Sequence, residues 1–234
     1  MWSGSLSTLE MTSRYIQDIQ LRSLDVDLDA YFGRIKYAGP RETTVQVLND
    51  ICLCHAMNIP FNNVSCVQGQ GVDLSPSVVD DKLIVRARGG YCFEMNSLLF
   101  RVLVKLGFTA ELVSGRIHLG YRKISQSKLC PRTHAFILVT IDGKRFAADV
   151  GVGHLTPTAA ISLDTAEEQT TPNELVRIVT TEEKTTEYKL QVSFLSMFSI
   201  KNYLNGQQLL SVIFRFVLFC WPTHVRFGMI ISKP

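Results

Sequence analysis

The segment Arg88-Gly89-Gly90-Tyr91-Cys92-Phe93-Glu94-Met95-Asn96 predicts a glycine turn that leads directly into a helix. Apolar residues then recur at helical spacing as far as Leu106, and Gly107 follows as a stop signal. Cys92 is therefore expected in the first turn, where unpaired backbone N–H groups and the positive helix end favour a thiolate. A buried cysteine that acts only as a small hydrophobe is the alternative. Cys92 is the candidate nucleophile of the chain.

Composition limits the classes of function. The 234 residues are 46% hydrophobic, which is enough for one large domain or two to three small ones. With 24 Lys and Arg against 21 Asp and Glu, the charge balance gives no reason to expect nucleic acid or a membrane surface as a partner. Scattered cysteines and the lack of a secretory-type N-terminal segment predict a reduced, cytoplasmic protein.

Two local patterns resemble functional signals but do not meet their requirements. Cys52-Leu53-Cys54-His55 has the residue types of a metal site, but no second Cys or His pair stands at zinc spacing, so no metal is expected. Leu209 to Trp221 is nearly continuous apolar sequence, yet thirteen residues are too few to span a bilayer. A buried helix or strand is the expectation there, with no membrane span.

The order of periodicities predicts an α+β fold. Helical spacing extends from about Leu9 to Met57, and strand-like runs follow Gly107. A helical N-terminal layer is thus expected before an antiparallel β-barrel or sheet. The expected strands are Ala110–Val113, Arg116–Leu119, His134–Ile141 and Lys144–Val150. The expected parts are a helical domain at 1–109 with the nucleophile, a β-barrel domain at 110–193 and a C-terminal segment at 194–234.

One hairpin is specific enough to give a register. Asp142-Gly143 is the signal for a two-residue type I′ turn between β-favouring runs. If Ile141 faces Lys144, then Asp149 lies on the same face as His134 and diagonal to it. An imidazole and a carboxylate can bridge that separation, so the hairpin supplies a His–Asp pair.

A cysteine nucleophile needs a base that accepts and returns a proton, and the base needs an acceptor that fixes its tautomer. Cys92, His134 and Asp149 meet these needs in a papain-like arrangement. These three residues alone do not name the acyl donor, so a papain-like or transglutaminase-like acyl-transfer or hydrolytic enzyme remains an alternative.

Further motifs accompany these residues, namely Tyr31-Phe32-Gly33-Arg34-Ile35, Ile59-Pro60-Phe61-Asn62-Asn63, residues 88–96, Arg132-Thr133-His134 and Asp149-Val150-Gly151-Val152-Gly153. In these motifs the chain closely resembles the arylamine N-acetyltransferases, from about residue 20 to 190. By that resemblance the enzyme takes acetyl from acetyl-coenzyme A onto Cys92 and passes it, by a ping-pong route, to the nitrogen of an aromatic amine or hydrazine. His134 would be the base and Asp149 its orienter. Acetyl-coenzyme A would be a co-substrate, with no bound cofactor.

The resemblance also implies substrate-binding positions. Phe61, Phe93 and Val152 would line the acceptor pocket, while Thr133 and Gly151 would border the thioester end of the coenzyme. These expectations assign small molecules as the partners and a role in xenobiotic metabolism. The oligomeric state does not follow from the sequence.

Three departures from the family pattern bear on function. Asn62 stands where the family usually has Glu, a residue expected to pair with the arginine that matches Arg88. Val152 stands where Phe is common, which predicts a wider acceptor pocket without that aromatic face. After about Ser193 the chain does not follow the family's C-terminal lid domain. A divergent, truncated lid segment is therefore expected, and an inactive truncated paralogue is a further alternative.

Overall fold

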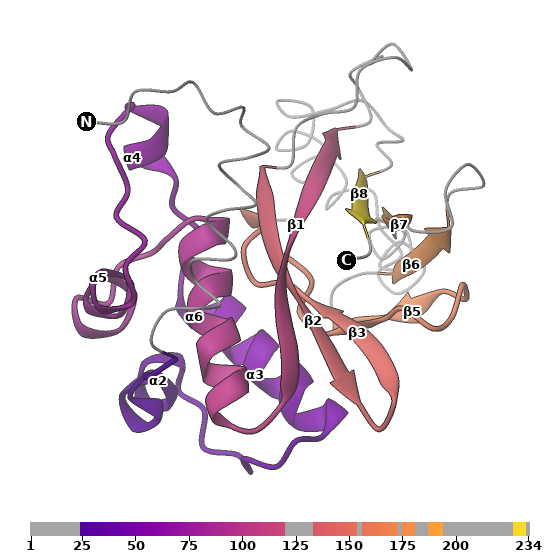
Figure 1. The fold of residues 1–234 in the computed structure, drawn as a ribbon, viewed down its shortest axis with the longest axis horizontal. Coiled ribbons are helices and arrows are strands. Elements are labelled where there is room, and N and C mark those ends of the chain that lie inside the picture. Colours follow the sequence, from indigo (N-terminus) through magenta and orange to yellow (C-terminus); the bar gives the residue numbers. More distant parts are fainter. Residues whose placement is uncertain are drawn as a thin grey trace, which may run out of the picture.

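The protein is an α+β structure in which helices cover one face of an antiparallel sheet (Figure 1). This computed structural model describes residues 24–119, 133–153, 156–172, 175–180, 187–193 and 227–232. The helices are α2 (Leu28–Ile35), α3 (Val45–Asn58), α4 (Val64–Val67), α5 (Pro76–Asp80), the π-helical turn η1 (Asp81–Val85) and α6 (Cys92–Lys105). The strands are β1 (Thr109–Leu119), β2 (His134–Ile141), β3 (Lys144–Ala148), β4 (Ile161–Ser162), β5 (Gln169–Thr170), β6 (Leu175–Thr180), β7 (Glu187–Ser193) and β8 (Phe227–Ser232).

Local capping signals account for where the main helices begin and end. The Asp27 side chain accepts the Ala30 N–H at 2.9 Å at the start of α2, and Thr44 caps α3 in the same way. Helix α6 begins at Cys92, and Gly107, with φ of 96°, follows its end. The predicted position of Cys92 in the first turn is thus confirmed.

The predicted hairpin is also confirmed. Ile141 pairs with Lys144, and the register continues to Ile137 opposite Ala148. Asp142 and Gly143 have φ of 50° and 74°, the two positive values that a type I′ turn requires. Strand β3 ends at Ala148, two residues before the predicted end.

The prediction of two separate strands after Gly107 is wrong. Residues 109–119 form the single strand β1 because Ser114 and Gly115 continue the extended backbone instead of turning. The first part of β1 pairs with β2, from Thr109 to Gly115, and residues 115–119 pair with β8 on the other side. The expected strands are two parts of one long strand with different neighbours.

The sheet is antiparallel and curls on itself. Its strand order is β4-β3-β2-β1-β8-β7-β6-β5. The side-chain NH₂ of Gln169 donates to the Ser162 carbonyl at 2.8 Å, and the side-chain oxygen of Gln169 accepts the Ser162 backbone N–H at 2.7 Å. These two hydrogen bonds join the edge strands β4 and β5. A small core on this side packs Val176 and Ile178 of β6 against Phe136 of β2. These contacts give the sheet a barrel-like curvature, so β2 is buried on both faces.

The main core lies between the helices and the opposite face of the sheet. Helix α6 runs beside β1 and β2, with α3 next to it (Figure 1). Leu48, Leu98, Leu99 and Ile137 are fully buried there. Each such side chain contributes about 1.5–3 kcal/mol on burial, so this core fixes α6, and with it Cys92, against the sheet.

Some sequence predictions lie outside the described residues. Among these are the helical spacing from Leu9 to residue 23 and the apolar run Leu209–Trp221. Of the C-terminal segment at 194–234, the structure describes β8, which pairs with both β1 and β7. In the described part of the chain, no helix combines the length and apolar character needed to cross a membrane.

Candidate active site

The turn before Cys92 is held by a neighbouring chain segment. The Gly90 N–H donates to the Pro60 carbonyl at 3.2 Å, and the Asn62 N–H donates to the Gly90 carbonyl at 2.8 Å. A Cβ at Gly89 would lie 2.2 Å from the Pro60 carbonyl oxygen. Only glycine fits this approach, so the glycine pair lets the segment carrying Phe61 lie directly against the turn.

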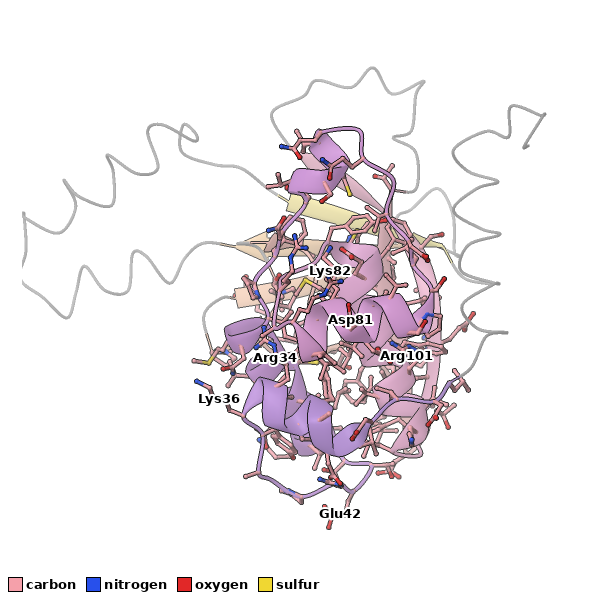
Figure 2. All side chains as sticks on the ribbon, turned by 90° about the vertical axis from the view of Figure 1, so that its left-hand side faces the viewer. Arg34, Lys36, Glu42, Asp81, Lys82 and Arg101 are labelled. Carbon is pink, nitrogen blue, oxygen red and sulfur yellow. The ribbon has the colours of Figure 1, made fainter. Side chains whose placement is uncertain are left out.

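Arg34 of α2 braces the same turn from the helical face. Its guanidinium donates to the carbonyls of Leu83 at 2.9 Å, Asn58 at 2.5 Å and Ala87 at 3.3 Å. The planar fork of donors suits one arginine to three carbonyls at once. Figure 2 shows Arg34 on this face together with Lys82 of η1. Arg34 therefore links α2, α3 and the chain that leads to Cys92.

The family pairing expected at Arg88 is replaced by local contacts. Asn62 uses its side-chain oxygen to accept the Val64 N–H at 3.1 Å. Arg88 is exposed and makes no ion pair with any residue that the structure describes. The turn thus relies on Arg34 and on the glycine contacts instead of an Arg88 ion pair.

Glu94 supports the start of α6. Its buried carboxylate accepts the Tyr91 N–H at 3.0 Å and the Lys82 ammonium at 2.6 Å. The first contact satisfies a backbone donor that a helix start leaves open. The second supplies the countercharge that a buried carboxylate needs. Lys82 and Glu94 together anchor the helix turn that contains Cys92.

The predicted His–Asp pair is formed. His134 is fully buried, and its Nε2 lies 2.5 Å from Oδ2 of Asp149. The other ring nitrogen, Nδ1, has no hydrogen-bond partner that meets normal geometry among the described residues. Cys92 is 7% exposed at the start of α6, and its sulfur lies 3.8 Å from the Thr133 carbonyl, next in sequence to His134. Cys92, His134 and Asp149 are therefore gathered in one buried cluster.

Charge in this cluster sets the state of the histidine. Burial by itself lowers the pKa of His134, but the Asp149 carboxylate and the Cys92 sulfur outweigh it and raise that pKa to about 10. The ring is then protonated at neutral pH, and its Nε2–H donates to Asp149. The arrangement favours an imidazolium that has a carboxylate on one side and a sulfur on the other.

Asn96, one helical turn after Cys92, positions Asp149. Its side-chain Nδ2 donates to Oδ1 of Asp149 at 2.9 Å and to the Ala135 carbonyl at 2.7 Å. Its Oδ1 accepts the Val150 N–H at 3.0 Å. Asn96 belongs to the motif at residues 88–96, but the motif alone does not indicate its role. Its i+4 spacing from Cys92, which puts both on one helix face, is the signal that could have found it.

Gly151 brings the loop after β3 against Cys92. Its N–H donates to Oδ1 of Asp149 at 2.9 Å, and a Cβ at Gly151 would lie 2.7 Å from Cα of Cys92 and 2.9 Å from Nδ2 of Asn96. Glycine is needed here because the Cys92 backbone cannot retreat without moving α6. The loop and the helix start therefore form one rigid unit.

Replacing Gly151 with Ala is expected to lower the free energy of unfolding by about 1–3 kcal/mol, because the added methyl overlaps α6 and Asn96. Urea unfolding of the variant measures the change. Gly33→Ala is the matched control, since a Cβ there meets nothing within 4 Å and alanine favours a helix. Equal stability of the Gly151 variant and the wild type would contradict the close contact.

A partly enclosed pocket of about 220 Å³ lies beside this cluster. It is bounded by the end of α3, the first turn of α6 and the loop after β3. A larger hollow, of about 470 Å³, lies beside Lys105 at the opposite end of α6 from Cys92. Proximity to Cys92 identifies the smaller pocket as the relevant one. Its lining residues are Ala56, Met57, Ile59, Phe61, Met95, Val150, Gly153, Thr156 and Thr158.

Of the five expected substrate-binding residues, Phe61 lines the pocket and the other four lie elsewhere around Cys92 or in its neighbouring loops. Phe61, 40% exposed, lines the pocket. Phe93 is half-buried against the ring of Tyr91, with centroids 5.5 Å apart. Thr133 and Gly151 flank Cys92, as given above. Val152 is half-buried and donates its N–H to Thr156, but does not line the pocket.

Among the described residues, no group of three or more His, Cys, Asp or Glu side chains is arranged to hold a metal ion. Cys52 and His55, from the Cys-rich pattern, are buried in the main core on α3. Nδ1 of His55 forms a hydrogen bond with the Tyr31 hydroxyl at 2.9 Å.

Known proteins match this chain in sequence and in fold. A family model described as N-acetyltransferase matches residues 44–203. The chain belongs to the arylamine N-acetyltransferase family. The arylamine N-acetyltransferase of Mycobacterium tuberculosis is 40% identical over 147 residues, which make up 62% of this chain and 51% of that protein. The chain thus spans about half the length of the curated relatives it matches.

Two solved structures of arylamine N-acetyltransferases share the fold. The enzyme from Salmonella typhimurium has a TM-score of 0.69 and 27% identity, and the match covers 91% of this chain and 64% of that one. The enzyme from Mycobacterium marinum, solved in complex with CoA, has a TM-score of 0.68 and 28% identity, with 89% and 67% covered. The family expected from the sequence motifs is therefore confirmed.

Proposed function

We propose that the chain transfers acetyl from acetyl-coenzyme A, through a thioester on Cys92, to the nitrogen of an aromatic amine or hydrazine. The observation that carries this proposal is the buried His134–Asp149 pair beside a cysteine at a helix start. Membership of the arylamine N-acetyltransferase family supports the choice of donor and acceptor. It favours this activity over a papain-like or transglutaminase-like reaction.

In the first half-reaction, the Cys92 thiolate attacks the thioester carbonyl of acetyl-coenzyme A. The coenzyme's sulfur leaves with the electron pair of the broken C–S bond, and the His134 imidazolium supplies its proton. The product is acetyl-Cys92 with a neutral His134. Asp149 holds the ring by its Nε2–H throughout, which keeps Nδ1 as the nitrogen that exchanges the proton.

In the second half-reaction, the acceptor nitrogen attacks the acetyl carbonyl on Cys92. His134 takes the proton that the nitrogen loses, and the Cys92 sulfur leaves as a thiolate beside the new imidazolium. The cycle returns to its starting charges. This two-stage route is what the single nucleophile and single base of the cluster can carry out in a ping-pong sequence.

The remaining positions receive roles by the same proposal. Phe61 provides an apolar wall for the acceptor ring. Phe93 and Val152 do not line this pocket, and only the family resemblance assigns them to the acceptor region. Thr133 and Gly151, on either side of Cys92, border the thioester of the coenzyme.

The proposal predicts that brief incubation with acetyl-coenzyme A adds one acetyl group to Cys92, visible by intact-protein and peptide mass spectrometry. Cys92→Ala should abolish the addition. Cys66→Ala is the matched control, because Cys66 is an exposed cysteine outside the cluster and its loss should change nothing. p-Nitrophenyl acetate, as a small donor, tests Cys92 independently of coenzyme binding.

The two donors separate the alternatives. Acetylation of Cys92 by both donors, followed by its discharge with an aromatic amine, is the expected result. Acetylation by the small ester alone would refute acetyl-coenzyme A as donor. No acetylation of Cys92 by either donor would refute the acetyltransferase and leave the inactive paralogue.

A further inference from the structure

The pocket beside Cys92 has a polar group that the fold does not use. Most of the side chains that line it are apolar, with Phe61, Ile59 and Met95 among them. The polar side chains among the lining residues are Thr156 and Thr158. A pocket lined mainly by apolar side chains, with a small number of polar groups that fix orientation, is typical of a small-molecule site.

The two threonines differ in what their hydroxyls bind. Oγ1 of Thr156 donates to the Gly153 carbonyl at 2.7 Å and accepts the Val152 N–H at 3.0 Å, so it holds the loop together. The Thr158 residue is only 7% exposed, and its Oγ1 has no hydrogen-bond partner among the described residues. Burial of a hydroxyl without a partner is unfavourable, and native proteins rarely leave one so.

The pocket has the size and position for one substituted aromatic ring. A cavity of about 150 Å³ with apolar walls is enough to hold benzene, and this one measures about 220 Å³. Met95 lies three residues after Cys92 on α6, and Gly153 follows two residues after Gly151, which packs on Cys92. An acceptor whose amine points at acetyl-Cys92 would therefore place the opposite end of its ring in this pocket.

We infer that Thr158 is a specificity-determining residue whose hydroxyl binds a small polar substituent on the acceptor ring, opposite the amine. The inference deepens the proposed function and rests on it for the direction in which the amine points. Oγ1 of Thr158 is buried in this structure. A rotation of roughly 120° about χ1 moves a threonine hydroxyl to the position that its methyl held, without backbone movement, and this is how we expect Oγ1 to meet the substituent. The substrate class is a single-ring arylamine with a hydroxyl or similar hydrogen-bonding group at its far end.

The test compares 4-aminophenol with 4-methylaniline, which differ by a hydroxyl and a methyl group of similar size. The ratio of their kcat/KM values is measured for the wild type, for Thr158→Val and for Thr158→Ser. The preference for 4-aminophenol should fall by roughly three- to tenfold in the valine variant, as expected for one neutral hydrogen bond. The serine variant, which keeps the hydroxyl, should retain the preference. Thr140→Val is the matched control, because Thr140 is exposed on β2 outside the pocket, and it should leave the ratio unchanged.

Two measurements separate this inference from the proposed function. Acetylation of Cys92 by p-nitrophenyl acetate needs no acceptor, so it should be the same in the wild type and the valine variant. Calorimetric titration of both compounds into the unacetylated protein needs no turnover, and only 4-aminophenol binding should weaken in the valine variant. An unchanged ratio, or failure of both compounds to bind, would overturn the role of Thr158 whether or not Cys92 is acetylated.

Discussion

Replacing Asp149 with Asn is expected to lower kcat for acetyl transfer by roughly a thousandfold to ten-thousandfold while the fold is retained. The reason is the tautomer of His134. Asn96 Nδ2 and the Gly151 N–H both donate to Oδ1 of Asp149, so the oxygen of the new amide would take that position. Its NH₂ group would then face Nε2 of His134 and make that nitrogen an acceptor. The ring proton would move to Nδ1, which could no longer accept a proton from Cys92 or from the amine.

Pre-steady-state acetylation of Cys92 and steady-state turnover both measure this loss, and circular dichroism checks the fold. Asp164→Asn is the matched control, because Asp164 is exposed and its side chain contacts Arg145 at the surface. An exposed ion pair contributes little, so this variant should keep full activity. Turnover of the Asp149 variant within tenfold of the wild type would exclude the proposed role of the His–Asp pair.

The second expected effect is on stability and comes from His55. Burial, and then the charge of Arg34, lower the pKa of His55 from its usual 6.5 to about 3. Between these two values the unfolded chain binds a proton that the native protein does not bind. Stability therefore decreases as the pH falls through 6.5 toward 3. At pH 4 the loss from this one ring is roughly 3 kcal/mol relative to pH 7.

Urea unfolding at pH 7 and at pH 4 measures this loss. His55→Gln removes the titrating ring, so its stability should change much less between the two pH values, although it starts from a lower value without the imidazole next to Tyr31. Carboxylates that also titrate in this range are present in both proteins and cancel in the comparison. The same pH dependence in the two proteins would show that His55 is not buried in the neutral form.

His134 makes stability depend on pH in the opposite direction, with a loss at alkaline pH. Because its pKa in the folded protein is raised to about 10, its stabilisation is complete below pH 6.5 and is lost as the pH rises toward 10. It therefore adds nothing to the acid loss. His55, kept neutral by burial, therefore limits stability at acid pH, and His134, kept charged by Asp149, limits it at alkaline pH.

The sequence alone was sufficient where a local rule applies. Apolar spacing and Gly107 predicted the bounds of the helix that starts at Cys92, and Asp142-Gly143 predicted the hairpin and its register. The His134–Asp149 contact followed from that register, since both residues belong to one local unit. The split of β1 into two strands was wrong because strand length depends on the neighbouring strands, and β8 lies far away in sequence.

Only the tertiary structure decided what supports these residues. Asn96 and Asp149 are 53 positions apart, and Arg34 reaches carbonyls from Asn58 to Ala87. The sequence also could not predict that the Thr158 hydroxyl lacks a hydrogen-bond partner, because that depends on all the groups packed around it. Periodicity and turn chemistry act over a few residues, whereas these contacts exist only after burial in the core brings the helices onto the sheet.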